Sequence, residues 1–287
     1  MRGVVLATLA AVALAACGSG HSRAPTPTPT ATPVARPHRG HRRDRAVAAL
    51  PAAPAQVRGA AARRMPIPIL TYHVIATPPA GAPYPGLWVP TRTFAAQMES
   101  LRRAGYHAIT LAAAFAAWRG GAPLPRRPVV LSFDDGYLGD YTHARPVLRR
   151  LGWPGVLNLL LANVRRGDLT ARDVRGLIRA GWEVDSHTLT HPDLTTTGAA
   201  QLRRELAGSR AEIRRRFGQP ADFFCYPSGR YDARVVAAVR AAGYRGALTE
   251  DEGYGVAAQP YTLKRVRVQG GGSPAALLAA LRAERPR

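Results

Sequence analysis

The strongest constraint on the fold is a regular alternation of short apolar runs with segments of helical periodicity along residues 65–287. Strands are predicted at 67–73, 129–133, 156–161, 182–186, 222–226, 246–249 and 262–268. Helices are predicted at 91–104, 111–118, 141–151, 170–180, 199–217, 232–242 and 274–282. Strands that alternate with helices over short connections form parallel sheets that are covered by helices. The sequence therefore predicts a single α/β domain with a parallel sheet.

Polar residues follow several of these strands directly. Asp134 and Asp135 end one apolar run, and His187 and His191 follow another. His73 ends the first predicted strand. Functional groups in such folds collect at the C-terminal ends of parallel strands, so we expect these side chains to meet at one end of the sheet.

The residue types in this group point to a hydrolytic metal site. One carboxylate and two imidazoles make a three-ligand set with room for water, and the second carboxylate is left as a base. Mixed nitrogen and oxygen ligands suit Zn²⁺, with Co²⁺, Ni²⁺ or Mn²⁺ as alternatives. Asp185 could orient a ligand imidazole, or it could have a capping or solvent-exposed role.

The two motifs, at 132–136 and 187–191, resemble those of the polysaccharide deacetylase family, also called NodB-homology domains or carbohydrate esterase family four. The family pattern T-F-D-D-G is matched with Ser132 in place of Thr, and H-[ST]-x-x-H is matched fully. The resemblance covers roughly residues 65–270. It implies a distorted (β/α) barrel of about seven parallel strands.

The resemblance also implies roles for the four motif residues. Asp134 would be the base that takes a proton from water at the metal. Asp135, His187 and His191 would be the metal ligands. The water would then attack an acetyl carbonyl that the metal polarises.

The chain departs from the family pattern in its third motif, R-x-P-x-G, which aligns with 225–229. By this alignment the backbone N–H of Ser228 would help to bind the oxyanion. Cys225 stands where many members have the Arg that orients the catalytic Asp. Arg265 is a candidate for that task, and a surface arginine is the alternative.

A second departure concerns the general acid. Many members carry Leu-x-His near the C-terminus, but here the sequence has Arg265 at that point and no histidine after His191. His73 is the candidate acid, and a structural histidine at a strand end is the alternative. This placement resembles the permuted branch of exported poly-N-acetylglucosamine deacetylases.

The N-terminus has the pattern of a bacterial lipoprotein. An apolar stretch over 4–16 is too short to span a bilayer as a stable anchor. It leads to a lipobox-like sequence in which Cys17 would be acylated. Residues 1–17 would then be the signal peptide and lipobox. An ordinary secretory signal is the alternative. Residues 18–64 are rich in Pro, Thr and Arg and predict a disordered linker, so that the catalytic domain spans 65–287. These features predict an exported protein that is lipid-anchored to the outer face of the cell membrane.

The formal net charge is +22, and Lys264 is the only basic residue that is not arginine. Export argues against nucleic acid as a partner, so anionic wall polymers or lipid headgroups fit better, although a general Arg bias also explains much of the charge. With Cys17 acylated, Cys225 has no disulfide partner and is predicted to be a buried strand residue. We expect a monomer.

Together these features predict a metal-dependent hydrolase that removes N-acetyl groups from an extracellular or cell-wall polysaccharide of the N-acetylglucosamine type. An O-acetyl polysaccharide esterase and an inactive glycan-binding lipoprotein are the alternatives. The sequence does not identify the polymer.

Overall fold

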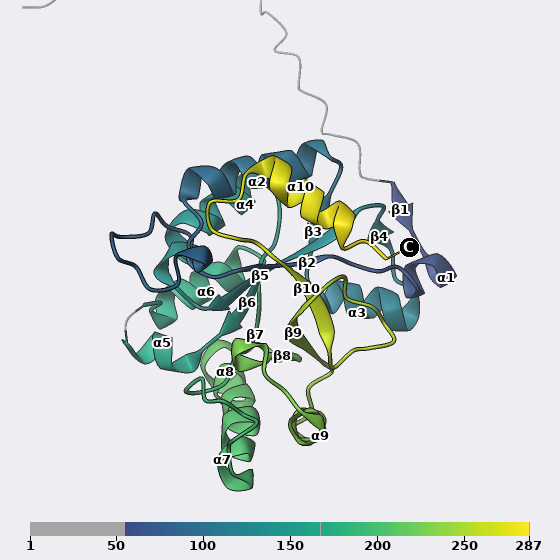
Figure 1. The fold of residues 1–287 in the computed structure, drawn as a ribbon. Coiled ribbons are helices and arrows are strands. Elements are labelled where there is room, and N and C mark those ends of the chain that lie inside the picture. Colours follow the sequence, from purple (N-terminus) through teal and green to yellow (C-terminus); the bar gives the residue numbers. More distant parts are fainter. Residues whose placement is uncertain (1–54, 167, 287) are drawn as a thin grey trace, which may run out of the picture. The chain divides into compact units, whose positions relative to one another are not determined.

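Seven parallel strands close into a barrel in the computed structural model, which describes residues 55–166 and 168–286 (Figure 1). In ring order the strands are β2 (Ile69–Tyr72), β5 (Pro128–Asp135), β6 (Val156–Leu159), β7 (Glu183–Ser186), β8 (Phe223–Cys225), β9 (Gly246–Glu252) and β10 (Leu263–Arg267). The ring closes where β2 pairs with both β5 and β10, with Val266 opposite Leu70. The predicted α/β barrel of about seven parallel strands is confirmed.

Three short strands lie outside this ring. β3 (His107–Ile109) pairs in parallel with the first residues of β5. β1 (Gln56–Val57) pairs antiparallel with β4 (Leu124–Pro125). None of the three was predicted, because runs of two or three residues carry no readable periodicity.

The described structure begins before the predicted domain boundary at Met65. Both β1 and α1 (Gly59–Arg63) precede that boundary, and α1 packs against α3 (Leu111–Gly120). The expected linker of 18–64 is therefore too long at its C-terminal end. Cys17 and the rest of residues 1–54 lie outside the described residues.

The helices surround the barrel (Figure 1). Besides α1 and α3 they are α2 (Thr91–Arg103), α4 (Arg145–Leu151), α5 (Leu161–Arg166), α6 (Ala171–Arg179), α7 (Ala199–Arg203), α8 (Ser209–Phe217), α9 (Ala233–Ala241) and α10 (Pro274–Ala283). The helix predicted at 199–217 contains a π-helical segment, Arg204–Gly208, between α7 and α8. Thr170 caps α6 in a capping box with Asp173, as the sequence indicates.

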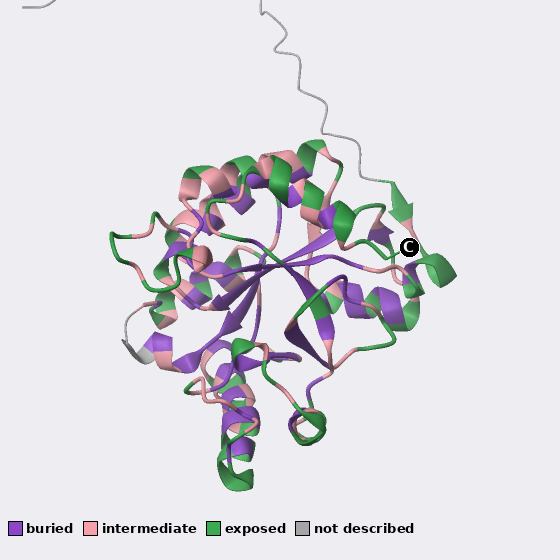
Figure 2. Ribbon diagram, in the orientation of Figure 1, coloured by how far each residue is buried: buried purple, intermediate pink, exposed green. Residues whose placement is uncertain are grey.

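The barrel interior contains an apolar cluster toward its N-terminal end and the carboxylate of Asp134 toward its C-terminal end. Val130, Val156, Phe223 and Leu263 form one buried cluster with Phe115 of α3. Alternation along β5 places Ser132 and Asp134 on the same face as Val130, nearer the C-terminal end. The strands are buried while the outer faces of the helices are exposed (Figure 2). Asp134, on the inward face of β5, therefore lies toward the C-terminal end of the barrel.

Among the described residues, none of the helices combines the length and apolar character that crossing a membrane requires.

Candidate active site

A cavity of about 780 Å³ opens at the C-terminal end of the barrel. It is lined by all the predicted site residues except Arg265, which lies buried beneath it: His73, Asp134, Asp135, His187, His191 and Ser228. These residues come from the ends of β2, β5, β7 and β8. The barrel therefore brings together groups that lie far apart in the sequence.

Asp134 is a buried carboxylate, 1% exposed, that is held from several sides. The Asn158 amide of β6 donates to its Oδ1 at 2.7 Å, and the Cys225 thiol lies 3.6 Å from its Oδ2. Nη1 of Arg265 lies 3.0 Å from Oδ1 and 2.9 Å from Oδ2. Burial alone would raise the pKa of Asp134, but Arg265 and His73 outweigh this effect and hold it below its ordinary value. The carboxylate is therefore ionised at neutral pH.

Arg265 of β10 occupies the barrel interior and is 2% exposed. Besides Asp134, it donates to the Thr249 carbonyl at 2.6 Å, to the Ser132 hydroxyl at 3.2 Å and to Glu250 at 2.5 Å. A surface position, the alternative that the sequence allowed, does not hold. The Arg265 guanidinium contacts Asp134, the carboxylate that the arginine of the full third motif would orient.

Asp135, His187 and His191 form a possible metal-binding group. The Nε2 atoms of His187 and His191 lie 3.5 and 3.8 Å from Oδ1 of Asp135, and all three donor atoms fall within 4.8 Å of one another. Ligands about 2.0–2.1 Å from a tetrahedral metal ion are roughly 3.3–3.4 Å apart. The spacing therefore fits a single ion with only small adjustments.

The hydrogen bonds of the histidines also suit metal ligation. Nδ1 of His187 lies 2.8 Å from the Cys225 carbonyl, so this nitrogen carries the proton and Nε2 keeps its lone pair. Burial and the neighbouring His187 lower the pKa of His191, which leaves that imidazole neutral at pH 7. Asp185 does not orient an imidazole, since it accepts the Phe223 backbone N–H instead.

Two other groups of possible ligands involve Asp134, one with His187 and Cys225 and one with His73 and Glu250. In both, Asp134 is already neutralised by Arg265 and hydrogen-bonded by Asn158. Burial raises the pKa of the Cys225 thiol, so it is protonated and a poor ligand. Asp135, His187 and His191 are therefore the best metal-binding set among the described residues.

Left-handed backbone is concentrated at this site. Asp135, Thr188, His191 and Ser228 have φ angles of 72°, 72°, 60° and 53°. Residues with side chains adopt this region at a cost of about 1–3 kcal/mol each, and such strain persists where surrounding structure enforces it. In the second motif the Thr188 hydroxyl accepts the His191 backbone N–H at 2.9 Å and fixes the turn between the two histidines.

His73 and Ser228 complete the cavity wall. The side chain of His73 is 15% exposed, and its Nε2 lies 3.9 Å from Oδ2 of Asp134. Ser228 lies in the 3₁₀ turn Pro227–Gly229 that follows β8. Both therefore border the space beside Asp134.

Two residues of this network were missed in the sequence. Asn158 is the one polar residue in the apolar strand β6. Its position on the strand next to the one that carries Asp134 is the signal that could have identified it. Glu250 accepts from both Arg265 and Arg267, and only the folded structure brings these three together.

A closed parallel barrel with a base, a three-donor metal-binding group and a candidate acid at its C-terminal end has the architecture of a hydrolase. Residues 121–247 match the family model described as polysaccharide deacetylase. The polysaccharide deacetylase homologue YxkH of Bacillus subtilis (strain 168) is 30% identical over 212 residues, which are 73% of this chain and 74% of that protein. The chain belongs to the polysaccharide deacetylase family, and it is a hydrolase of that family.

Two further proteins are similar to this chain. The Streptococcus pyogenes deacetylase PplD, solved in complex with acetate, superposes with a TM-score of 0.70 at 25% identity and covers 76% of this chain and 98% of its own. The poly-β-1,6-N-acetyl-D-glucosamine N-deacetylase of Escherichia coli (strain K12) is 44% identical over 68 residues, which are 24% of this chain and only 10% of that protein.

Proposed function

We propose that this chain is a metal-dependent N-deacetylase of an exported or cell-envelope polysaccharide built from N-acetylglucosamine. The observation that carries the proposal is the ionised Asp134 beside the donor set of Asp135, His187 and His191. The E. coli relative, named for its action on poly-β-1,6-N-acetylglucosamine, supports the substrate class.

The metal would be held by Asp135, His187 and His191, with Zn²⁺ the best match to two imidazoles and one carboxylate. When bound, it would lower the pKa of water and polarise the acetyl carbonyl.

Each remaining step uses a group of the chain itself. Asp134, which Arg265 and Asn158 hold in place, accepts the proton of the attacking water. The backbone N–H of Ser228 donates to the oxyanion that develops on the acetyl group. His73 donates a proton to the leaving amine, which departs poorly without one.

The requirement for an acid separates amide from ester cleavage. An alkoxide leaves more readily than an unprotonated amine, so an O-acetyl esterase would depend less on His73. The position of His73, 3.9 Å from the base, favours the N-deacetylase.

The proposal includes export and a lipid anchor at Cys17, supported by the lipobox-like sequence alone.

The test is acetate release by the purified full chain from N-acetylglucosamine oligomers and from an O-acetylated glycan. The protein is assayed after chelation, with and without added Zn²⁺, beside Asp134→Asn and the exposed control Glu99→Gln on α2. Zn²⁺-dependent release from the N-acetyl substrate, lost in Asp134→Asn and kept in Glu99→Gln, is the expected result. Release from the O-acetylated glycan alone would make the protein an esterase. Failure to release acetate from either substrate with metal bound would favour a glycan-binding protein.

A further inference from the structure

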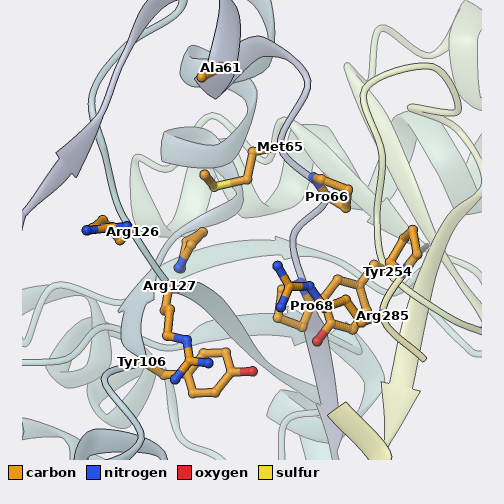
Figure 3. Close-up of a pocket in the computed structure, with 11 residues that line it drawn as sticks. Ala61, Met65, Pro66, Pro68, Tyr106, Arg126, Arg127, Tyr254 and Arg285 are labelled. Atoms are coloured by element: carbon orange, nitrogen blue, oxygen red, sulfur yellow. The ribbon is translucent and has the colours of Figure 1, made fainter. Parts of the chain in front are cut away.

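Two further cavities lie next to each other at the opposite end of the barrel from the active site. Two hollows of about 410 and 510 Å³ share the side chains of Arg126, Arg127 and Arg285. Tyr106 and Tyr254 line the smaller one (Figure 3). We call these five residues the arginine groove.

The arginine groove is separate from the active site. Arg126 and Arg127 immediately precede β5, and Asp134 lies near the far end of that strand. Six residues of extended strand between Pro128 and Asp134 span about 20 Å. A ligand in the groove would therefore touch none of the groups assigned to catalysis.

The charge of the groove is not neutralised by the described part of the chain. None of the described residues that line the two cavities is acidic. Within residues 55–166 and 168–286, none of the three arginines forms an ion pair, whereas exposed arginines elsewhere, such as Arg102 and Arg230, pair with carboxylates. Three unpaired guanidinium groups around one hollow attract an anion.

Two of the guanidinium groups are directed into the groove. Arg127 stacks on the Tyr106 ring with its Cζ atom 5.4 Å from the ring centre, and it donates to the Ala104 carbonyl. Figure 3 shows this stack and the Arg285 side chain beside Tyr254. Burial raises the pKa of Tyr254, and the charges of Arg285 and Arg127 oppose that rise, so both lie near its phenol. A guanidinium fixed on an aromatic ring keeps its remaining N–H donors available for carboxylate or phosphate oxygens.

We propose that the arginine groove is a second, non-catalytic binding site for an anionic glycan, a polymer that bears phosphate or carboxylate groups. A hollow lined by three arginines and two tyrosines fits the side of an anionic polymer chain, whereas a membrane-binding surface would present protruding apolar side chains. Among the described residues, the two exposed large hydrophobic side chains, Tyr84 and Leu138, lie in or beside the catalytic cavity instead. The groove would hold the protein on an anionic polymer while the other end of the barrel accepts the acetylated substrate.

The test measures binding of the full chain to soluble poly(glycerol phosphate), to polygalacturonate and to neutral dextran, by titration calorimetry at low and at high salt. The groove variant is Arg126→Gln/Arg127→Gln/Arg285→Gln. The matched control, Arg92→Gln/Arg149→Gln/Arg150→Gln, removes three exposed arginines that also form no ion pair within the described chain. A double variant, Arg126→Gln/Arg285→Gln, leaves the Arg127 stack intact and guards against misfolding.

We expect the wild type and the control to bind at least one anionic polymer and not dextran. The groove variant should bind about tenfold more weakly, since exposed charge pairs are individually weak and three are removed together. The double variant should fall between them. Acetate release from a short neutral N-acetyl oligomer should be unchanged in all three variants.

Equal loss of affinity in the groove variant and the control would overturn the proposal in favour of general surface charge. Equal binding of the groove variant and the wild type would overturn it as well. A further titration uses vesicles of anionic lipid, and a difference seen there and with neither polymer would overturn the proposal by assigning the groove to a membrane surface. Because binding is measured without catalysis, these outcomes are independent of the proposed deacetylase activity.

Discussion

Replacing Arg265 with Met tests how the buried charge of Asp134 is tolerated. Two unit charges 2.9 Å apart attract each other by about 6 kcal/mol at an effective dielectric constant of about 20. Desolvation of both groups offsets much of this attraction. Removing only the arginine leaves a carboxylate that is 1% exposed without its counter-charge, so we expect the free energy of unfolding at pH 7 to fall by about 3–5 kcal/mol.

The same variant should change the pH dependence of catalysis. Arg265 opposes the effect of burial on the pKa of Asp134, so its loss raises that pKa. More of the base is then protonated at any given pH, and activity is lost first on the acid side. The acid limb of kcat/KM for acetate release should move to higher pH.

The assays are urea denaturation and kcat/KM as a function of pH, with two comparisons. Asp134→Asn/Arg265→Met removes both charges and should regain at least about 2 kcal/mol of the loss. Arg267→Met, two residues along the same strand and paired with the same Glu250, has a side chain that is 41% exposed and should cost less than about 1 kcal/mol. If Arg265→Met costs no more than Arg267→Met and leaves the acid limb in place, the ion pair does not control the base and our reasoning is wrong.

Four further predictions follow from the site and the chain termini. His73→Ala should lower turnover on N-acetyl oligomers by about 100-fold or more with unchanged bound metal, as measured by acetate release and metal analysis; unchanged turnover would exclude it as the acid. His191→Ala should lower Zn²⁺ affinity, measured by competition with a chelator, by at least about tenfold; unaltered affinity would remove it from the ligand set. Burial raises the pKa of Glu183 to about 7, so the folded state holds a proton that the unfolded state releases from about pH 4.3 upward. Through this group, stability should fall by about 3 kcal/mol as the pH rises to 7 and then level off, and this contribution should be missing in Glu183→Gln, as followed by denaturation at each pH. Cys17→Ser should move the protein from the membrane to the soluble exported fraction on cell fractionation, and an unchanged distribution would argue against the lipid anchor.

The sequence predicted the barrel well because local patterns of apolar and capping residues indicate most of its strands and helices. The apolar runs that became β5 to β8 alternate with capped helices, such as the one that starts after Thr170. Both depend on neighbouring residues, which pattern analysis reads directly. The short strands β1, β3 and β4 are held only by tertiary pairing, so the pattern missed them.

The sequence predicted most of the residues of the candidate site but not the contacts between them. Asp134, Asp135 and the two motif histidines stand at strand ends, where parallel sheets place functional groups. The contact between Arg265 and Asp134 joins β10 to β5, and the resemblance suggested it only as one of two possibilities. Asn158 and Glu250 belong to no motif, so their contacts with this pair needed the three-dimensional structure.

The closure of the barrel has a consequence for the order of folding. β10, the last strand, pairs with β2, the first strand of the ring, so the seam forms between opposite ends of the described chain. Contacts of such large sequence separation carry a high loop-closure entropy and form slowly. A chain that is cut or stopped before Leu263 would keep every residue of the two motifs at 132–136 and 187–191 but would lose the seam and the guanidinium beside Asp134. Shortened products of this protein should therefore be inactive rather than partly active.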